Sequence, residues 1–263
     1  MKICLDAGHY KGYNAGAVKG YYEGDIVWKI TNYQKKYLEE YEGVTVILTR
    51  SDISKDLSLA NRGAKSKGCD LFLSNHTNAV TTESVDRAVV IYPFDNINNS
   101  KALADKLASV INKIIGAKQN YQLMQKTLPN RKQDYYGVMR SARSAGCPRY
   151  YILEHGFHTN KAICTWLMSD SNLEKLAKAE VEVIAAYYGL KKKSSSTNTS
   201  SSTSYLVEIN TSVLNVRKGA GTSYPITTQV KKGQVYTIVE EKNGWGLLKS
   251  KLGWICLKYT KKK

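Results

Sequence analysis

The chain has 263 residues, 42% of them hydrophobic, which is enough for one sizeable core plus a smaller module and argues against a disordered protein. Its formal net charge of +17 favours a polyanionic partner such as nucleic acid, membrane headgroups or an anionic cell-wall polymer. No run approaches the roughly 18 apolar residues needed to cross a bilayer, so we expect no membrane insertion. The five cysteines show no C-x-x-C spacing, which argues against both a disulfide framework and a thiolate zinc knuckle.

Strand and helix signals alternate from the N-terminus to about residue 190. Short apolar and β-branched runs predict strands at 2–6, 44–49, 70–75, 88–92 and 150–154. Apolar residues at helical spacing predict helices at 25–41, 56–68, 100–117 and 172–190. This alternation indicates an α/β fold, a mostly parallel twisted sheet flanked by helices, in which chemistry gathers at the carboxyl ends of the strands.

A low-complexity segment divides the chain. Residues 191–204, KKKSSSTNTSSSTS, are nearly free of apolar side chains and predict a flexible linker. The linker separates a domain over 1–190 from a module over 205–263. In the module, short β-rich runs are punctuated by glycines without helical periodicity, which predicts a small all-β barrel. The basic excess is concentrated in the linker and this module.

Metal-binding side chains follow several of the predicted strands. His9 comes after KICLDAG, His76 after LFLSN and Glu154 after YYIL, and Glu23 lies in the loop after the first strand. The ends of parallel strands converge on one edge of a sheet, and two imidazoles with one carboxylate make a catalytic zinc site that keeps an open position. A further carboxylate is then needed to accept a proton from the attacking water. We therefore predict His9, Glu23 and His76 as ligands of Zn²⁺ and Glu154 as the acid–base group.

The pattern alone leaves ordinary interpretations open. Either histidine can be a hydrogen-bonded surface residue, Glu23 can be a helix-start carboxylate favoured by the helix dipole, and Glu154 can pair with a lysine. No H-E-x-x-H motif is present to decide the matter.

Four segments, in order, carry a resemblance to a known family: LDAGHYKGYNAGAVKGYYEGDI, LTRSD, SLANRGAKSKGCDLFLSNHTNA and PRYYILEHGFHTN. They resemble the zinc-dependent N-acetylmuramoyl-L-alanine amidases of the Amidase_3 type, which occur in bacterial autolysins and phage endolysins. The resemblance covers about residues 1–190. It implies that His9 of D-x-G-H, Glu23 and His76 of S-x-H-x-N bind zinc, and that Glu154, before G-F-x-x-N, is catalytic.

The sequence departs from the family at two places. Tyr10 and Lys11 stand where a glycine pair commonly follows the first histidine, and Gly24 stands where a lysine commonly follows the glutamate ligand. Both departures lie in loops expected to face substrate, so they put the peptide preference in doubt more than metal binding.

Polar residues near these motifs are further candidates for substrate binding. Asn75 and Asn78 flank the second histidine and are expected to orient it, to bind substrate, or to serve only as turn residues. The polar stretch 126–148 is expected to form one wall of the groove. There Tyr136 suits a sugar ring and Arg140 suits the carboxylates of a peptide stem, although surface exposure alone explains them equally well.

Three other polar residues are expected to have structural roles. Arg62 is interpreted as a salt-bridge residue. His155 and His158 are expected to lie in a turn after Glu154, without a ligand role.

The second module, VLNVRKGAGTSYPITTQVKKGQVYTIVEEKNGWGLLKSKLGWICLKY, resembles the bacterial SH3-like cell-wall-binding domains. The resemblance implies a peptidoglycan stem or cross-bridge peptide as ligand. Trp254 is expected in the barrel core, and Trp245 is a candidate ligand contact. The basic excess adds attraction to anionic wall polymers, which salt screens.

Together these features predict a peptidoglycan hydrolase that cleaves the amide between N-acetylmuramic acid and L-alanine. No signal-peptide pattern is evident at the N-terminus, which favours a phage endolysin made in the host cytoplasm and acting at the wall after release. The alternatives are a zinc peptidase acting within the stem peptide and a non-catalytic wall-binding protein. Nucleic-acid binding is disfavoured because the clustered lysines lack interleaved stacking aromatics.

Overall fold

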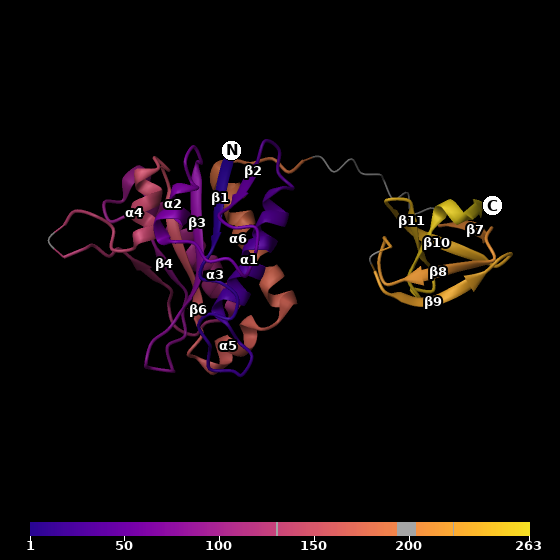
Figure 1. Ribbon diagram of the computed structural model, residues 1–263, viewed down its shortest axis with the longest axis horizontal. Coiled ribbons are helices and arrows are strands. Elements are labelled where there is room, and N and C mark those ends of the chain that lie inside the picture. The colour runs from indigo at the N-terminus through magenta and orange to yellow at the C-terminus, as the bar shows by residue number, and fades with distance from the viewer. Residues whose placement is uncertain (130, 194–203, 223) are drawn as a thin grey trace. The chain divides into compact units, whose positions relative to one another are not determined.

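The computed structural model describes residues 1–129, 131–193, 204–222 and 224–263. The chain divides into two compact units, Met1–Lys193 and Ser194–Lys263 (Figure 1). Most of the predicted linker, residues 194–203, lies outside the described residues. The preceding Lys191–Lys193 belongs with the first unit, since the Lys193 amide donates to the carbonyl of Glu40 at 2.7 Å. No helix in the described part of the chain is long and apolar enough to cross a membrane.

A six-stranded sheet forms the centre of the first unit. In sheet order its strands are β2 (Thr45–Leu48), β1 (Lys2–Ala7), β3 (Leu71–Asn78), β6 (Tyr150–Phe157), β4 (Val89–Ile91) and β5 (Gln122–Met124). Every neighbouring pair is parallel except β6 and β4, which are antiparallel. The predicted mostly parallel α/β sheet is therefore confirmed.

Helices cover both faces of this sheet. They are α1 (Glu23–Leu38), α2 (Leu59–Ala64), α3 (Ser100–Ile115), α4 (Gly137–Ser144), α5 (Lys161–Leu167) and α6 (Asp170–Tyr188), with a 3₁₀ turn η1 at Ile97–Asn99. Successive residues of β1 enter different cores, as the alternation of a strand requires. Ile3 and Leu5 pack into the larger core with residues of α1, α3 and α6, whereas Cys4 packs with Phe72 and residues of α4. Figure 1 shows α2 and α4 on one side of the sheet and α1 and α6 on the other.

The observed elements differ from the predicted ones in length and number. The strand predicted at 150–154 continues to Phe157, so His155 lies inside a strand and the predicted turn at this residue is wrong. The helix predicted at 56–68 is only Leu59–Ala64. Three short elements, β5, α4 and α5, were not predicted, because they have three to eight residues and offer too little periodic pattern.

The second unit is an all-antiparallel sheet of seven strands, which confirms the predicted all-β module. The strands in sheet order are β13 (Thr260–Lys262), β7 (Tyr205–Ile209), β10 (Val235–Lys242), β11 (Trp245–Leu248), β12 (Trp254–Cys256), β8 (Val213–Arg217) and β9 (Ile226–Lys231), with a 3₁₀ turn η2 at Leu257–Tyr259. Its core consists of Val207, Ile209, Leu214, Val216, Val230, Ile238, Leu248 and Ile255. Trp254 is only partly buried and lies outside this cluster, so the prediction that it is a core residue is wrong.

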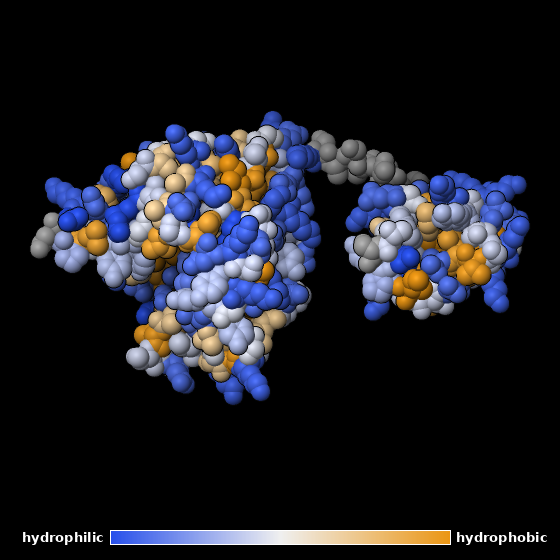
Figure 2. Space-filling model, viewed as in Figure 1, coloured by the Kyte–Doolittle hydropathy of each residue, from blue (hydrophilic) through white to orange (hydrophobic). Residues whose placement is uncertain are grey.

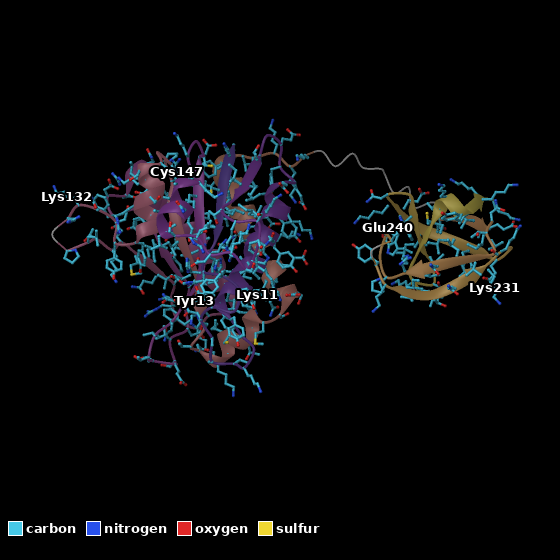
Figure 3. All side chains as sticks on the ribbon, in the orientation of Figure 1. Lys11, Tyr13, Lys132, Cys147, Lys231 and Glu240 are labelled. Carbon is cyan, nitrogen blue, oxygen red and sulfur yellow. The ribbon has the colours of Figure 1, made fainter. Side chains whose placement is uncertain are left out.

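The visible surface of both units is largely hydrophilic, with hydrophobic residues scattered among polar ones (Figure 2). Figure 3 shows Lys132 on a loop that extends from the first unit, whereas Lys11 and Tyr13 lie together on the loop after β1. That second loop carries the first of the predicted ligands.

Candidate metal centre

The structure brings His9, Glu23 and His76 together. His9 follows β1, Glu23 is the first residue of α1, and His76 lies in β3. One ligand atom from each of these residues lies within 4.8 Å of the others. Two imidazole nitrogens and a carboxylate oxygen at this spacing are a donor set that fits a divalent ion such as zinc.

Glu23 is the centre of this group. Its Oε1 lies 3.3 Å from His9 Nε2 and 3.1 Å from His76 Nδ1, and it accepts a hydrogen bond from the Thr77 amide at 3.0 Å. Its Oε2 accepts a hydrogen bond from Asn14 Nδ2 at 2.7 Å. Burial alone raises the pKa of Glu23, but the hydrogen bonds and positive charge of the two histidines outweigh it and hold the pKa well below its ordinary value. Glu23 is therefore ionised, as a metal ligand must be.

His76 fits closely against the end of β1. A Cβ atom added at Gly8 would lie 2.3 Å from His76 Cε1, so only glycine leaves room for the imidazole. Burial lowers the pKa of His76, yet the Glu23 carboxylate reverses this effect and raises it to about 9. The His9 ring stacks on Tyr13 with centroids 4.4 Å apart and meets the His76 ring edge-on at 4.9 Å.

The loop after β1 also completes the start of α1. The amide of Glu23 donates to the carbonyl of Asn14 at 2.8 Å, and the amide of Gly24 donates to the carbonyl of Tyr13 at 3.2 Å. A Cβ at Gly24 would lie 1.9 Å from the carbonyl oxygen of Tyr10. The two departures from the family pattern therefore meet in space, because the loop that contains Tyr10 approaches α1 too closely for a larger residue at position 24.

Glu154 lies directly beside the group. It is the register partner of His76 on the neighbouring strand β6, so both side chains leave the same face of the sheet. Its Oε2 is buried and has no hydrogen-bond partner among the described residues. Burial raises the pKa of Glu154 to about 7; His76 lowers it and Glu23 raises it by smaller amounts. A carboxyl group of this kind can exchange a proton near neutral pH.

The open space beside the metal group is a pocket of about 270 Å³. Its lining includes His9, His76, Tyr10, Tyr13 and Val138. The tyrosine side chains are partly exposed, at 38% for Tyr10 and 39% for Tyr13. Aromatic and apolar groups therefore lie next to the metal-binding atoms, where a substrate has to bind.

The two candidate asparagines have different surroundings. Asn75 has no exposed surface, because strand alternation turns it to the face opposite His76, where its Nδ2 donates to Gln34 Oε1 and Thr31 Oγ1. It therefore does not reach the pocket, and the prediction that it contacts substrate conflicts with this position. Asn78 remains partly exposed, and its Oδ1 accepts a hydrogen bond from the amide of Ala79 at 2.8 Å.

The candidates from 126–148 lie outside the lining of this pocket. Arg140 lies on α4 and donates from Nη1 to the carbonyls of Asp134 and Tyr135, just before that helix, at 2.9 and 2.6 Å, which uses part of its hydrogen-bonding capacity. Tyr136 packs partly buried on the α4 side of the sheet. Burial raises the pKa of Tyr136, and the negative charge of Glu154 raises it further.

The buried His155 contacts the backbone of the predicted ligand His76 and the side chain of Glu180. Its Nδ1 contacts the carbonyl of His76 at 2.9 Å, and its Nε2 contacts Glu180 Oε1 at 2.8 Å. Neither side chain of the His155–Glu180 pair has exposed surface. Burial lowers the pKa of His155, but the Glu180 carboxylate outweighs this effect and raises the pKa. The contact between the two side chains connects β6 to α6. His158 lies against Thr77, with Nδ1 and Oγ1 2.9 Å apart.

Residues 3–186 match the Amidase_3 family, described as N-acetylmuramoyl-L-alanine amidase, and this is more than half of the chain. The chain belongs to this family. Residues 212–260 match the bacterial SH3 domain family. No curated protein matches this chain in sequence.

Solved amidase structures share the fold of the first unit. The catalytic domain of the N-acetylmuramoyl-L-alanine amidase CwlV from Bacillus (Paenibacillus) polymyxa var. colistinus is 20% identical with a TM-score of 0.61, and the match covers 72% of this chain and 99% of that one. For the CwlD amidase from Clostridioides difficile, solved with the GerS lipoprotein, the identity is 25%, the TM-score 0.58 and the coverage 72% and 98%. The amidase AmiC2 of Nostoc punctiforme is 23% identical with a TM-score of 0.59, and the match covers 72% of this chain and 97% of that one. Together, the family match and these structures support a peptidoglycan amidase.

Proposed function

We propose that the chain is a zinc-dependent hydrolase that cleaves the amide between N-acetylmuramic acid and the L-alanine of the stem peptide. Family membership supports the reaction. The observation that carries the zinc proposal is the meeting of His9, Glu23 and His76, whose ligand atoms lie within 4.8 Å of one another.

The donor set is the one that catalytic zinc prefers, with three protein ligands of nitrogen and oxygen type. Bound zinc lowers the pKa of a water molecule towards 7 and polarises a carbonyl oxygen. His9 and His76 would hold the ion through their ring nitrogens and Glu23 through its ionised carboxylate. Asn14 and the Thr77 amide fix that carboxylate, so little ordering remains to be done when the metal binds.

Glu154 moves the proton in this reaction. Its Oε2, which no described residue hydrogen-bonds, takes a proton from the attacking water and returns it to the nitrogen of the departing L-alanine. Its pKa of about 7 makes it an effective base for the first transfer and an effective acid for the second. Tyr10 and Tyr13 would pack against the sugar or peptide on either side of the bond.

Digestion of purified cell walls tests this function. We expect new amino termini at L-alanine without new reducing sugars, and we expect a chelator to abolish their formation. New termini at other residues would identify the peptidase instead. The absence of any product, with wall binding intact, would identify a non-catalytic wall-binding protein.

The second unit is proposed to bind the wall, with peptidoglycan peptide as its ligand. It has a pocket of about 320 Å³ whose lining includes Trp245 and Tyr259 together with Arg217 and Lys258. None of the described residues that line this pocket carries a carboxylate, so its positive charge suits the carboxylates of a stem peptide. Attachment raises the concentration of the catalytic unit at its substrate, and the positive charge of the chain adds attraction to anionic wall polymers.

Replacing Trp245 by alanine is therefore expected to weaken binding of the full chain to isolated walls by about tenfold, because truncating a central aromatic contact commonly costs more than 1 kcal/mol. The matched control is Val239→Ala, which removes an apolar side chain that is 40% exposed and lies outside the pocket lining. A pelleting assay on purified walls measures both variants. Equal binding by the two would exclude Trp245 as a ligand contact.

We further propose that the chain is a phage or prophage endolysin, made in the host cytoplasm and acting at the wall after release. A wall-hydrolysing unit joined to a wall-binding unit is suited to this task. Cells that express the chain alone should stay intact until their membrane is permeabilised. Lysis without permeabilisation would instead indicate an exported autolysin.

A further inference from the structure

Two buried arginines bind the backbone just where the chain leaves β1. Arg62 donates from Nη1 to the carbonyl of Ala7 at 2.7 Å and from Nη2 to the carbonyl of His9 at 2.7 Å. Arg50 donates from Nε to the carbonyl of Ala7 at 3.2 Å and from Nη2 to the carbonyl of Gly8 at 3.3 Å. Three consecutive carbonyls are thus held by two guanidinium groups, which we call the arginine clamp.

Arg62 is the more completely bonded member of the clamp. Besides the two carbonyls, its Nε donates to the carbonyl of Leu57 at 2.9 Å. Its Nη1 donates to Asp6 Oδ1 at 2.9 Å, and its Nη2 donates to Asp56 Oδ1 at 2.8 Å. Each of the five N–H groups of a guanidinium can therefore have an acceptor, although the residue is only 3% exposed.

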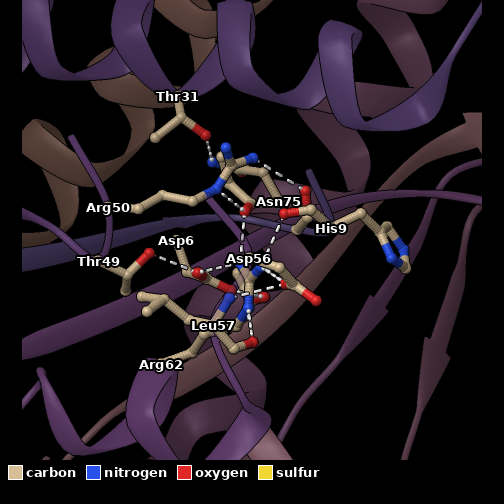
Figure 4. A network of polar contacts seen from close by, with 12 residues as sticks. Asp6, His9, Thr31, Thr49, Arg50, Asp56, Leu57, Arg62 and Asn75 are labelled. Atoms are coloured by element: carbon tan, nitrogen blue, oxygen red, sulfur yellow. Dashed lines mark hydrogen bonds and ion pairs between the residues drawn. The ribbon is translucent and has the colours of Figure 1, made fainter. Parts of the chain in front are cut away.

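Asp6 fixes Arg62 from within the sheet. Its side chain is 1% exposed, and its Oδ2 accepts a hydrogen bond from Ser74 Oγ at 2.7 Å. Its Oδ1 accepts a hydrogen bond from Thr49 Oγ1 as well as from Arg62. Figure 4 shows Asp6, Thr49 and Arg62 gathered together, with the His9 imidazole turned away from them.

The held segment has a backbone conformation that it would not adopt easily. His9 has a φ of 57°, in the left-handed region that costs a residue other than glycine roughly 1 kcal/mol or more. This turn directs the His9 imidazole towards Glu23, with Nε2 and Oε1 3.3 Å apart. If His9 relaxed to an extended conformation, its side chain would point elsewhere and the metal group would lose one ligand.

We propose that Arg62, assisted by Arg50, is a positioning residue that holds His9 in its left-handed conformation and so sets the affinity of the metal centre. This proposal rests on the proposed zinc-dependent function. The competing explanation is that Arg62 only neutralises Asp6 in the core, in which case any cation at position 62 would serve. The two explanations differ in whether the forked shape of the guanidinium matters. A guanidinium reaches three acceptors here, the Ala7 carbonyl, the His9 carbonyl and Asp6, whereas one ammonium group cannot reach all three.

The test compares Arg62→Lys and Arg50→Lys with the matched control Arg143→Lys in the full chain. Arg143 also binds a carboxylate with both Nη atoms: Nη1 donates to Asp95 Oδ1 at 3.1 Å and Nη2 to Asp95 Oδ2 at 2.8 Å. It lies outside the lining of the metal-site pocket. Zinc affinity is measured by competition with a chromophoric chelator. We expect Arg62→Lys to lower it by about 10- to 100-fold, the usual cost of losing a group that orients a ligand. We expect a smaller loss for Arg50→Lys and none for the control.

A second measurement needs no metal. Labelling with ¹⁵N-histidine gives four backbone signals, one for each histidine in the chain. The HN–Hα coupling of His9, which depends on φ, is compared in the metal-free proteins. A change at His9 in Arg62→Lys, with the other three histidines unaffected, supports the clamp. If Arg62→Lys does not fold, the same comparison in Arg50→Lys decides.

Three results are informative. Unchanged zinc affinity and unchanged His9 coupling in the folded arginine variants would overturn the proposal. An equal loss of affinity in Arg143→Lys would reduce Arg62 to a structural ion pair. Failure of the unaltered chain to bind zinc would overturn the proposed function, while the His9 coupling would still show whether the arginines hold this turn.

Discussion

Replacing Glu154 by glutamine is expected to lower the rate of wall amide hydrolysis by about 10²- to 10⁴-fold, the usual contribution of a positioned general acid–base group. Glutamine has nearly the same shape but cannot accept the proton of the attacking water. Because Glu154 is not among the three grouped ligand residues, the variant should keep its bound zinc. The measurements are initial rates of L-alanine amino-terminus release and the zinc content of the purified protein.

The pH dependence of the unaltered enzyme should report the same group. Glu154 acts as a base only when ionised, and burial raises its pKa to about 7. The value of kcat/KM should therefore fall as the pH decreases through the folded-state pKa. A bound divalent cation favours the ionised form, so this acidic limb is expected at or below pH 7. The limb should be missing from the residual activity of Glu154→Gln.

A matched control is Glu174→Gln, which neutralises a partly exposed glutamate on α6 that pairs with Lys36. It should leave both the rate and the pH profile unchanged. If Glu154→Gln retained most of the activity, or if it lost its zinc, Glu154 would not be the acid–base group proposed here.

The site residues that could be predicted from the sequence are those with metal-binding or acid–base side chains that directly follow a clear strand pattern. His76 and Glu154 both follow short apolar runs, and parallel strands place such positions at one edge of a sheet. Strand alternation also contains the information that Asn75 faces away from His76, because adjacent residues of a strand point to opposite faces. The orientation of Asn75 could therefore have been predicted, but only if the strand had been known to continue through His76 to Asn78.

The remaining parts depend on contacts that no local pattern reveals. The expectation that Arg62 forms a salt bridge is confirmed, but its bond to the His9 carbonyl spans 53 positions of sequence and was not predicted. His155 was expected in a turn because the strand was expected to end at residue 154, and its pairing with Glu180, on α6, is also distant in sequence. The helix α4 is only eight residues long, and what orders it is the burial of Val138, Met139 and Ala142 against the sheet. Tertiary packing rather than local propensity therefore determines these features.

Replacing His76 by alanine is expected to lower zinc affinity by more than the 10- to 100-fold that typically follows loss of an orienting group, because a ligand itself is removed. Amide hydrolysis should be lost at zinc concentrations that saturate the unaltered enzyme. The neighbouring Asn78→Ala is the control, since Asn78 lies on the same strand but outside the grouped ligands. Metal analysis after dialysis against a weak chelator provides the measurement. Equal zinc retention by both variants would remove His76 from the ligand set.

The same substitution should change how the metal-free protein responds to pH. Although burial opposes it, the Glu23 carboxylate raises the pKa of His76 from the ordinary 6.5 to about 9. A raised pKa means that the folded state holds the proton more tightly, so this pair stabilises the protein fully below pH 6.5 and progressively less as the pH rises towards 9. The lowered pKa of Glu23 acts in the opposite sense, since its contribution is present above its ordinary value of 4.5 and is lost in acid. Thermal unfolding of the metal-free chain should therefore show stability declining between pH 6.5 and about pH 9, the ordinary and the raised pKa of His76. The His76→Ala variant should not show this decline. The decline should also disappear when zinc is bound, because the ion then takes the place of the proton on the imidazole.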